Sequence, residues 1–315
     1  MSIEAHGLKK AYGGTVALDG VSFTARAGEV VGLLGPNGAG KTTAIRVLTT
    51  ILPCDGGSFA VAGVPHTRPA EIRERVGVLP ESAGYPEQQT GVEFLRYHAR
   101  LFGHTRARAR ATADVLLGQV GLADRGSSPI GTYSRGMRQR LGIARALVND
   151  PEVVFLDEPT LGLDPAGQRQ VLSLVEGIAR DRGATVLLST HFLGEVEDTC
   201  ARVLILNRGR VVAEGTVAEV TRTAAAPRRG RFRVPAELRE RALATLAAVP
   251  GLGDAQPLDG RPDWVAASLK DIRHAHVSVS EAVRALADAG VPLLAFELEG
   301  ARLNDAFLSM TEEPA

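Results

Sequence analysis

The sequence is short of several features that mark particular classes of protein. Its 315 residues include two cysteines, Cys54 and Cys200, which lie far apart and match no metal-binding spacing. Such scarcity fits a reducing compartment. No apolar run approaches the roughly 18 residues that a membrane-spanning helix requires, and residues 1–4 show neither the basic nor the apolar region of a secretory signal. We therefore expect a cytoplasmic polypeptide that is soluble by itself.

An excess of charge of either sign is also missing. The chain carries 36 basic and 36 acidic residues and has a pI of about 7.1, so no global field would attract nucleic acid or an anionic membrane. Only four of the basic residues are lysine, which indicates genomic base composition rather than phosphate recognition. The apolar fraction of 44% is sufficient for real cores. At roughly 100–200 residues per domain, the length suits two domains.

What the chain does contain is a glycine-rich phosphate loop, Gly-Pro-Asn-Gly-Ala-Gly-Lys-Thr-Thr at 35–43. It follows an apolar run at 30–34 that predicts a buried strand, and it precedes helix-like spacing at 44–48. In this context backbone N–H groups and a helix N-terminus form a cradle for anions. Lys41 would reach the β/γ-phosphates, and the Thr42 hydroxyl would ligate Mg²⁺. The alternative, an ordinary glycine turn with an exposed lysine, is weakened by the flanking strand and helix.

Further functional residues follow strand-like runs. The apolar residues 153–156 lead directly into Asp157 and Glu158, as in a buried parallel strand whose carboxyl end carries function. An aspartate there helps to hold Mg²⁺, and Glu158 can polarise the attacking water as a general base. A strand at 185–189 delivers His191 to a position suited to a γ-phosphate. Tyr12 could stack on adenine or simply pack on a sheet, and both alternatives remain open.

The remaining pattern predicts two domains, 1–220 and 231–315, joined by a small, basic, proline-broken linker at 221–230. The first contains strands at 56–61 and 76–79, helical stretches at 93–120 and 134–148, and a hairpin at 203–213. Its arginines at 106, 108 and 110 suit a solvated face or a partner's surface. The second is a smaller α+β unit, with strands at 231–234, 264–269 and 293–298 and helices at 236–248, 280–289 and 303–310.

Taken in order, these motifs resemble those of the ATP-binding cassette (ABC) ATPases. Residues 133–141, Tyr-Ser-Arg-Gly-Met-Arg-Gln-Arg-Leu, lie just upstream of 153–158, where the family carries its Leu-Ser-Gly-Gly-Gln signature. Residues 160–165 look like the D-loop, and 78–81 occupy the Q-loop position. Six motifs in the right order over 1–220 make the resemblance highly specific. It implies a phosphate-loop α/β fold of the ABC type, with a mixed core sheet, an antiparallel subdomain and a helical subdomain.

The resemblance also implies a role for each matching residue. Adenine would stack on Tyr12, and the phosphates would be wrapped by Gly35, Pro36, Asn37, Gly38, Ala39, Gly40, Lys41, Thr42 and Thr43. Mg²⁺ would be served by Thr42 and Asp157, with Glu158 as general base and His191 as γ-phosphate sensor. Such cassettes act as head-to-tail homodimers, so Ser134 and Gly136 of one copy would close over ATP held by the other. Asp164 would link the two sites.

Three positions depart from the family pattern. Arg135 replaces a signature glycine, Met137 replaces the glutamine, and Glu81 stands where the Q-loop normally has glutamine, although a carboxylate there could still ligate Mg²⁺. The Ser-Arg-Gly-Met and Leu-Pro-Glu forms resemble exporter ATPases of the daunorubicin-resistance and sodium-export type. The unit at 222–310, with its closing Leu-Asn-Asp-Ala-Phe-Leu at 303–308, is similar to the accessory domain of that group.

This resemblance implies the ATP-hydrolysing subunit of an exporter. It would lie on the inner face of the membrane, bound through residues 82–105 to a separate permease, with no nucleic-acid partner. A soluble cassette acting on ribosomes or DNA is disfavoured, since there is one phosphate loop and no long coiled-coil insertion before Ser134. A ligand-sensing role for the C-terminal unit is compatible with export. The sequence does not identify the transported substrate, because in such systems the membrane subunit selects it.

Overall fold

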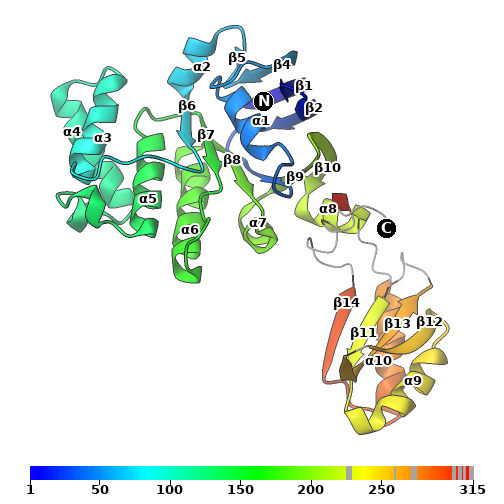
Figure 1. Cartoon of the computed structure of the whole chain (residues 1–315). Coiled ribbons are helices and arrows are strands. Elements are labelled where there is room, and N and C mark those ends of the chain that lie inside the picture. The colour runs from blue at the N-terminus through cyan, green and yellow to red at the C-terminus, as the bar shows by residue number, and fades with distance from the viewer. Residues whose placement is uncertain are drawn as a thin grey trace. The chain divides into compact units, whose positions relative to one another are not determined.

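The computed structural model describes residues 1–224, 229–258, 260–270 and 275–299, together with 303, 307, 310 and 311. These form two compact units, Met1–Val217 and Ala218–Ala315 (Figure 1). The sequence prediction placed the boundary after residue 220. Because the placement of the units relative to each other is not determined, each is described by itself.

A mixed sheet forms the centre of the first unit, with strand order β10-β9-β3-β8-β7-β6. Neighbouring strands are parallel except at the β9–β10 hairpin. Its strands are β3 (Val30–Leu34), β6 (Val76–Leu79), β7 (Val153–Asp157), β8 (Thr185–Thr190), β9 (Arg202–Asn207) and β10 (Arg210–Thr216). Every residue of β3, β7 and β8 is buried, which explains their continuous apolar runs. The parallel arrangement brings the carboxyl ends of β3, β7 and β8 to one edge.

An antiparallel sheet with order β2-β1-β4-β5 packs on this centre. It consists of β1 (Ile3–Tyr12), β2 (Thr15–Ala25), β4 (Gly56–Val61) and β5 (Val64–Pro65). Alternate residues such as Ile3 and Phe23 join Ile45 of helix α1 (Lys41–Leu48) and Phe155 of β7 in one apolar cluster. The first strands and the phosphate loop are therefore parts of a single core.

Helices account for the rest of the first unit. The helices α3 (Gly91–Leu101), α4 (Arg106–Gln119) and α5 (Arg135–Ala146) lie side by side as a helical group (Figure 1). The other helices are α2 (Pro69–Arg75), α6 (Pro165–Arg182) and α7 (Leu193–Thr199). The predicted mixed sheet, antiparallel sheet and helical group of a phosphate-loop α/β protein are thus confirmed.

The predicted helical stretch at 93–120 is largely helical in the structure, which divides it into α3 and α4. Gly103 adopts a left-handed φ of 80°, which ends the first helix. The Thr105 hydroxyl then accepts a hydrogen bond from the Arg108 N–H and caps the second helix.

The second unit is an antiparallel sheet with order β12-β13-β11-β14. Its strands are β11 (Arg229–Arg233), β12 (Leu252–Leu258), β13 (Arg261–Leu269) and β14 (Ala295–Glu299); its helices include α9 (Arg239–Ala247) and α10 (Ala275–Asp288). Phe232, Val265, Leu246 and Leu286 from sheet and helices share one apolar core.

The structure differs from the sequence prediction at two places in this part of the chain. Helix α8 (Val217–Ala224) and strand β11 enter the predicted 221–230 linker from its two ends, as the helix-favouring alanines there permit. Strand β12 was not predicted, because it contains glycine, aspartate and proline; Pro257 is tolerated because β12 is an edge strand. Of the predicted helix at 303–310, all but Leu303, Phe307 and Met310 lie outside the described residues.

Within the described ranges, the helices are too short or too polar to cross a bilayer.

Candidate active site

A cavity of about 500 Å³ opens at the edge where the carboxyl ends of the central strands meet. The phosphate loop, strand ends and D-loop contribute most of its lining: Tyr12, Ala17, Asn37, Gly38, Ala39, Gly40, Lys41, Thr42, Thr43, Glu81, Glu158, Leu161 and His191. The fold therefore brings together in one cavity most of the candidate residues, which come from distant parts of the sequence.

Two glycines of the phosphate loop lie so close to neighbouring backbone that neither position has room for a side chain. A Cβ at Gly35 would lie 2.5 Å from the Leu206 carbonyl oxygen, and a Cβ at Gly40 would lie 2.5 Å from the Ala17 carbonyl oxygen. Gly40 also has a left-handed φ of 108° where it precedes α1. These contacts fix the loop against the sheets, so that the N-terminus of α1 faces the cavity.

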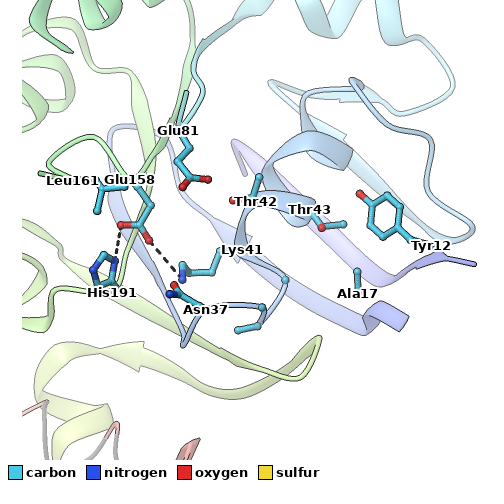
Figure 2. Close-up of a pocket in the computed structure, with 13 residues that line it drawn as sticks. Tyr12, Ala17, Asn37, Lys41, Thr42, Thr43, Glu81, Glu158, Leu161 and His191 are labelled. Carbon is cyan, nitrogen blue, oxygen red and sulfur yellow. Dashed lines mark hydrogen bonds and ion pairs between the residues drawn. The ribbon is translucent and has the colours of Figure 1, made fainter. Parts of the chain in front are cut away.

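Lys41 is the first residue of α1 and is buried. Its Nζ donates a hydrogen bond to the Gly35 carbonyl oxygen at 2.7 Å and lies 3.5 Å from Oε1 of Glu158 (Figure 2). The ammonium group is thus placed between the loop and the Glu158 carboxylate. There it can make strong charge-assisted hydrogen bonds to phosphate oxygens.

Glu158 is buried, and each of its two carboxylate oxygens lies close to a nitrogen of another side chain. Nδ1 of His191 lies 2.8 Å from Oε2, and Lys41 lies near Oε1 (Figure 2). The backbone at Glu158 has a left-handed φ of 50°, an uncommon conformation for a residue with a side chain and one that clusters at functional sites. Its N–H donates to Oγ of Ser189 at 3.0 Å. The carboxylate is therefore held at the cavity by His191 and Lys41, and the backbone behind it by Ser189.

Asp157 ends β7, next to Glu158, and is almost completely buried. Its Oδ1 accepts hydrogen bonds from Oγ1 of Thr42 at 3.2 Å and from Oγ of Ser189 at 2.6 Å. A hydroxyl and a carboxylate oxygen therefore converge beside the phosphate loop, and the carboxylate of Glu81 points towards Thr42 (Figure 2). These hard oxygen donors fit Mg²⁺, which in such sites takes one or two carboxylates plus substrate phosphates and water.

Tyr12 lies at the end of the cavity opposite His191 (Figure 2). The side chain is 45% exposed, and the Lys10 Nζ is 6.0 Å from the ring centroid. An exposed aromatic ring at this end of the cavity is available to stack on a nucleotide base. The alternative, a tyrosine packed into the sheet, would leave the ring less exposed than it is here.

The signature residues Ser134 and Gly136, and Asp164 of the D-loop, lie outside this cavity. Ser134 is exposed and caps α5 by accepting a hydrogen bond from the Met137 N–H at 3.2 Å. Asp164 is also exposed and caps α6 through the Gly167 N–H at 3.1 Å. In the chain as described, neither these two residues nor Gly136 lines the cavity. The guanidinium of Arg135 packs against Gly162, where a Cβ would lie 2.5 Å from its Cζ.

Sequence reasoning missed several residues around the site. Oγ of Ser189 donates to the Asp157 carboxylate and accepts from the Glu158 backbone N–H, and Glu195 of α7 is buried nearby. Thr160 and Thr190 donate to the Glu195 carboxylate. The signal for Ser189 was a polar residue at the end of an apolar strand, as for Asp157. Glu195 gave no signal, because an acidic residue on a short helix usually faces solvent.

Comparison with known proteins gives a consistent family. Residues 18–161 match the family model described as ABC transporter. The daunorubicin/doxorubicin resistance ATP-binding protein DrrA of Streptomyces peucetius is 40% identical over 315 residues, covering 100% of this chain and 93% of that protein. The Nod factor export ATP-binding protein I of Paraburkholderia xenovorans is 42% identical over 215 residues, covering 68% of this chain and 70% of that protein.

Solved structures match the first unit. A structure described as an ATP binding subunit of an ABC transporter is 32% identical with a TM-score of 0.64, covering 71% of this chain and 93% of its own. A dimeric bacterial ABC transporter cassette, MJ0796, has a TM-score of 0.63 at 23% identity, covering 68% of this chain and 98% of its own; at that identity it supports the fold alone. The chain therefore belongs to the ABC transporter family, as an ATP-hydrolysing subunit of the exporter type.

Proposed function

We propose that two copies of this chain bind two ATP molecules between them and energise export of a drug-like compound through a separate membrane permease. The observation that carries the proposal is the convergence of Lys41, Glu158 and His191 on one cavity beside the Thr42–Asp157 pair. Similarity to daunorubicin-resistance proteins over the whole chain, second unit included, supports the choice of substrate class.

In the proposed reaction, Glu158 is the general base that takes a proton from the attacking water. His191 holds the Glu158 carboxylate through Nδ1 at 2.8 Å and leaves its other ring nitrogen for the γ-phosphate. Lys41 exchanges its contact with the Gly35 carbonyl for phosphate oxygens and offsets their charge. His191 already contacts Glu158, and Lys41 already lies at the phosphate loop, so these side chains need little rearrangement before hydrolysis.

Mg²⁺ is proposed as the companion of ATP. Thr42 and Asp157 would hold it, with Glu81 at the cavity wall as a further oxygen ligand. When bound, such an ion offsets negative charge on the β- and γ-phosphates. The described residues include no group of three or more His, Cys, Asp and Glu side chains able to hold a metal on its own, which suits an ion that shares its ligands with a nucleotide.

Homodimerisation is proposed because the signature residues are remote from the cavity of their own chain. Ser134 is exposed at the N-terminus of α5, where the partial positive charge of the helix favours an anion. A head-to-tail partner would bring its Ser134 and Gly136 over the γ-phosphate. Asp164 would lie at the same interface between the two chains. The cassette MJ0796, which shares this fold, has been solved as a dimer, and that is consistent with the proposed assembly.

The permease contact is assigned to residues 82–105, which contain α3. This helix leaves Tyr97 56% exposed and Leu101 65% exposed, and Phe102 follows it at 44%. Large apolar side chains grouped on a surface are typical of a protein–protein contact. Through it, the chain would be held peripherally at the inner face of the membrane.

The test is reconstitution of the full chain with the permease encoded beside it, in lipid vesicles. ATP-dependent accumulation of daunorubicin inside inverted vesicles is expected, together with its loss in Glu158→Gln. ATP hydrolysis that is indifferent to every permease and every drug would contradict the export proposal. In that case a ligand-regulated switch acting through the second unit would be the better account.

A further inference from the structure

A buried carboxylate lies behind the catalytic pair and has no part in the reaction as proposed. Glu195 is on α7, four residues after His191, and is only 8% exposed. Its Oε2 accepts hydrogen bonds from Oγ1 of Thr160 at 2.8 Å and from Oγ1 of Thr190 at 3.0 Å. Its Oε1 has no hydrogen-bond partner in the part of the chain that the structure describes.

Such a group is costly to bury. Removal of a carboxylate from water requires compensation, and here two neutral hydroxyls are the donors. Burial raises the pKa of Glu195 above its ordinary range, and the negative charge of Glu158 raises it further, although the two threonine hydrogen bonds oppose this shift. An apolar residue would fill the position at lower cost, as Val196 does beside it. Packing alone therefore does not explain why a carboxylate occupies this position.

The two threonines identify that reason, because each adjoins a catalytic residue. Thr160 follows Glu158 by two positions at the start of the D-loop, and Thr190 immediately precedes His191. The Thr190 hydroxyl also accepts a hydrogen bond from the Phe192 N–H at 3.0 Å. The residues on both sides of His191 are thus tied, through one hydroxyl, to Glu195.

These bonds form a closed ring with the catalytic pair. From Glu158 the chain runs to Thr160, a hydrogen bond leads to Glu195, another leads to Thr190, and the next residue is His191, whose Nδ1 returns to Glu158 at 2.8 Å. In a ring of this kind, a shift of either segment stretches a hydrogen bond elsewhere in it.

We propose that Glu195 is a positioning residue for ATP hydrolysis: it joins the D-loop to the segment carrying His191, and thereby sets the geometry of the His191–Glu158 pair. The inference rests on the proposed roles of Glu158 and His191. Glu195 itself does not line the cavity. Its carboxylate oxygen acts as a shared acceptor, so an uncharged acceptor of the same shape should serve as well.

The experiment compares turnover and nucleotide affinity in full-length variants, in the assembly in which the wild-type chain hydrolyses ATP. Thr160→Val and Thr190→Val each remove one donor, and Glu195→Ala removes the acceptor. Glu195→Gln keeps an amide oxygen for both threonines. Thr185→Val is the matched control, because Thr185 is a buried, hydrogen-bonded threonine at the opposite end of the same strand β8. Thermal melting and ATP binding establish that each variant is folded.

We expect Thr190→Val and Glu195→Ala to lower kcat by about 10- to 100-fold while ATP affinity changes by no more than about 3-fold, the pattern of misplaced catalytic groups. Glu195→Gln should keep most of the activity. In a Glu158→Gln background, Thr190→Val should cause little further loss, since the pair it positions is already disabled.

Three results would overturn the inference. Thr160→Val and Thr190→Val could both turn over at the rate of Thr185→Val, Glu195→Gln could be as inactive as Glu195→Ala, or the losses could follow ATP affinity instead of kcat. Failure of the roles proposed for Glu158 and His191 would look different, because Glu158→Gln would then turn over ATP at the wild-type rate.

Discussion

The two sides of the proposed ATP site differ in how far a single chain completes them. On the phosphate-loop side, Lys41, Asp157 and Glu158 are all buried, and their polar atoms are engaged with one another or with their own loop. On the signature side, Ser134 and Asp164 are exposed, and their side-chain oxygens cap the helices that they begin. The first side is fixed by the fold of one chain, whereas in the proposed dimer the second would act on ATP held by the partner chain.

The difference has a structural cause. Parallel strands in register, with Asp157 opposite Ser189 and Leu34 opposite Thr190, fix the phosphate-loop side within one core. The signature side rests on the first turn of α5, in the helical group. Groups held by a sheet register move little, while a helix N-terminus keeps unsatisfied N–H groups that a ligand can use. The experiments that follow test each side separately.

The largest effect is expected on the buried side, in Glu158→Gln. Loss of the general base should lower ATP turnover by about 10²- to 10⁴-fold, whereas ATP affinity should remain, because Lys41 and the loop are intact. Single-turnover hydrolysis and equilibrium ATP binding measure the two quantities. Unimpaired turnover would remove Glu158 from its role.

Lys41→Ala should affect binding instead of chemistry. Removing one member of a buried charged contact with phosphate should weaken ATP affinity on the order of 100-fold or more. Isothermal titration with the variant measures this loss. Lys270→Ala is a suitable control, since the Lys270 Nζ donates to the Pro250 carbonyl oxygen within the second unit. Retained wild-type affinity in Lys41→Ala would contradict the phosphate-loop assignment.

A substitution on the exposed signature side should lower hydrolysis and leave ATP binding unchanged. Ser134→Arg places a bulky cation where a partner's γ-phosphate would arrive, so ATP binding by the monomer should be unchanged while hydrolysis falls by about 10-fold or more. Ser173→Arg, at a likewise exposed serine on α6, should leave both quantities unchanged. Normal hydrolysis by Ser134→Arg would mean that one chain forms the whole site.

The smallest effect concerns stability and Glu195. Its pKa is raised in the folded protein, so the folded state gains stability from the bound proton and loses this gain as the pH rises through the raised pKa. Glu195→Gln cannot ionise and should melt higher than wild type at neutral pH, by about 2–4 °C per kcal/mol of relieved burial cost. The difference should disappear as the pH falls below about 4. A difference that grows on acidification would have the wrong sign.

The difference between the two sides of the site also explains which features could be predicted from the sequence. Strands β3, β6 and the end of β7 with Asp157 and Glu158 were predicted, because a buried parallel strand is a continuous apolar run that ends at its functional residue. The position of Ser134 outside the cavity of its own chain was expected only through the resemblance to the ABC ATPases, because the residues alone do not show how the helical group packs. Glu195 was missed because its partners, Thr160 and Thr190, are polar residues whose burial arises only in the tertiary fold.

The central claim, that two chains complete each other's sites, is tested most directly by the mass of Glu158→Gln in solution as ATP is added. The account predicts a monomer without nucleotide and a dimer with ATP, and it predicts that adding Ser134→Arg to the same chain abolishes the dimer while ATP still binds. A Glu158→Gln chain that stays monomeric at saturating ATP, or a dimer indifferent to Ser134→Arg, would contradict it.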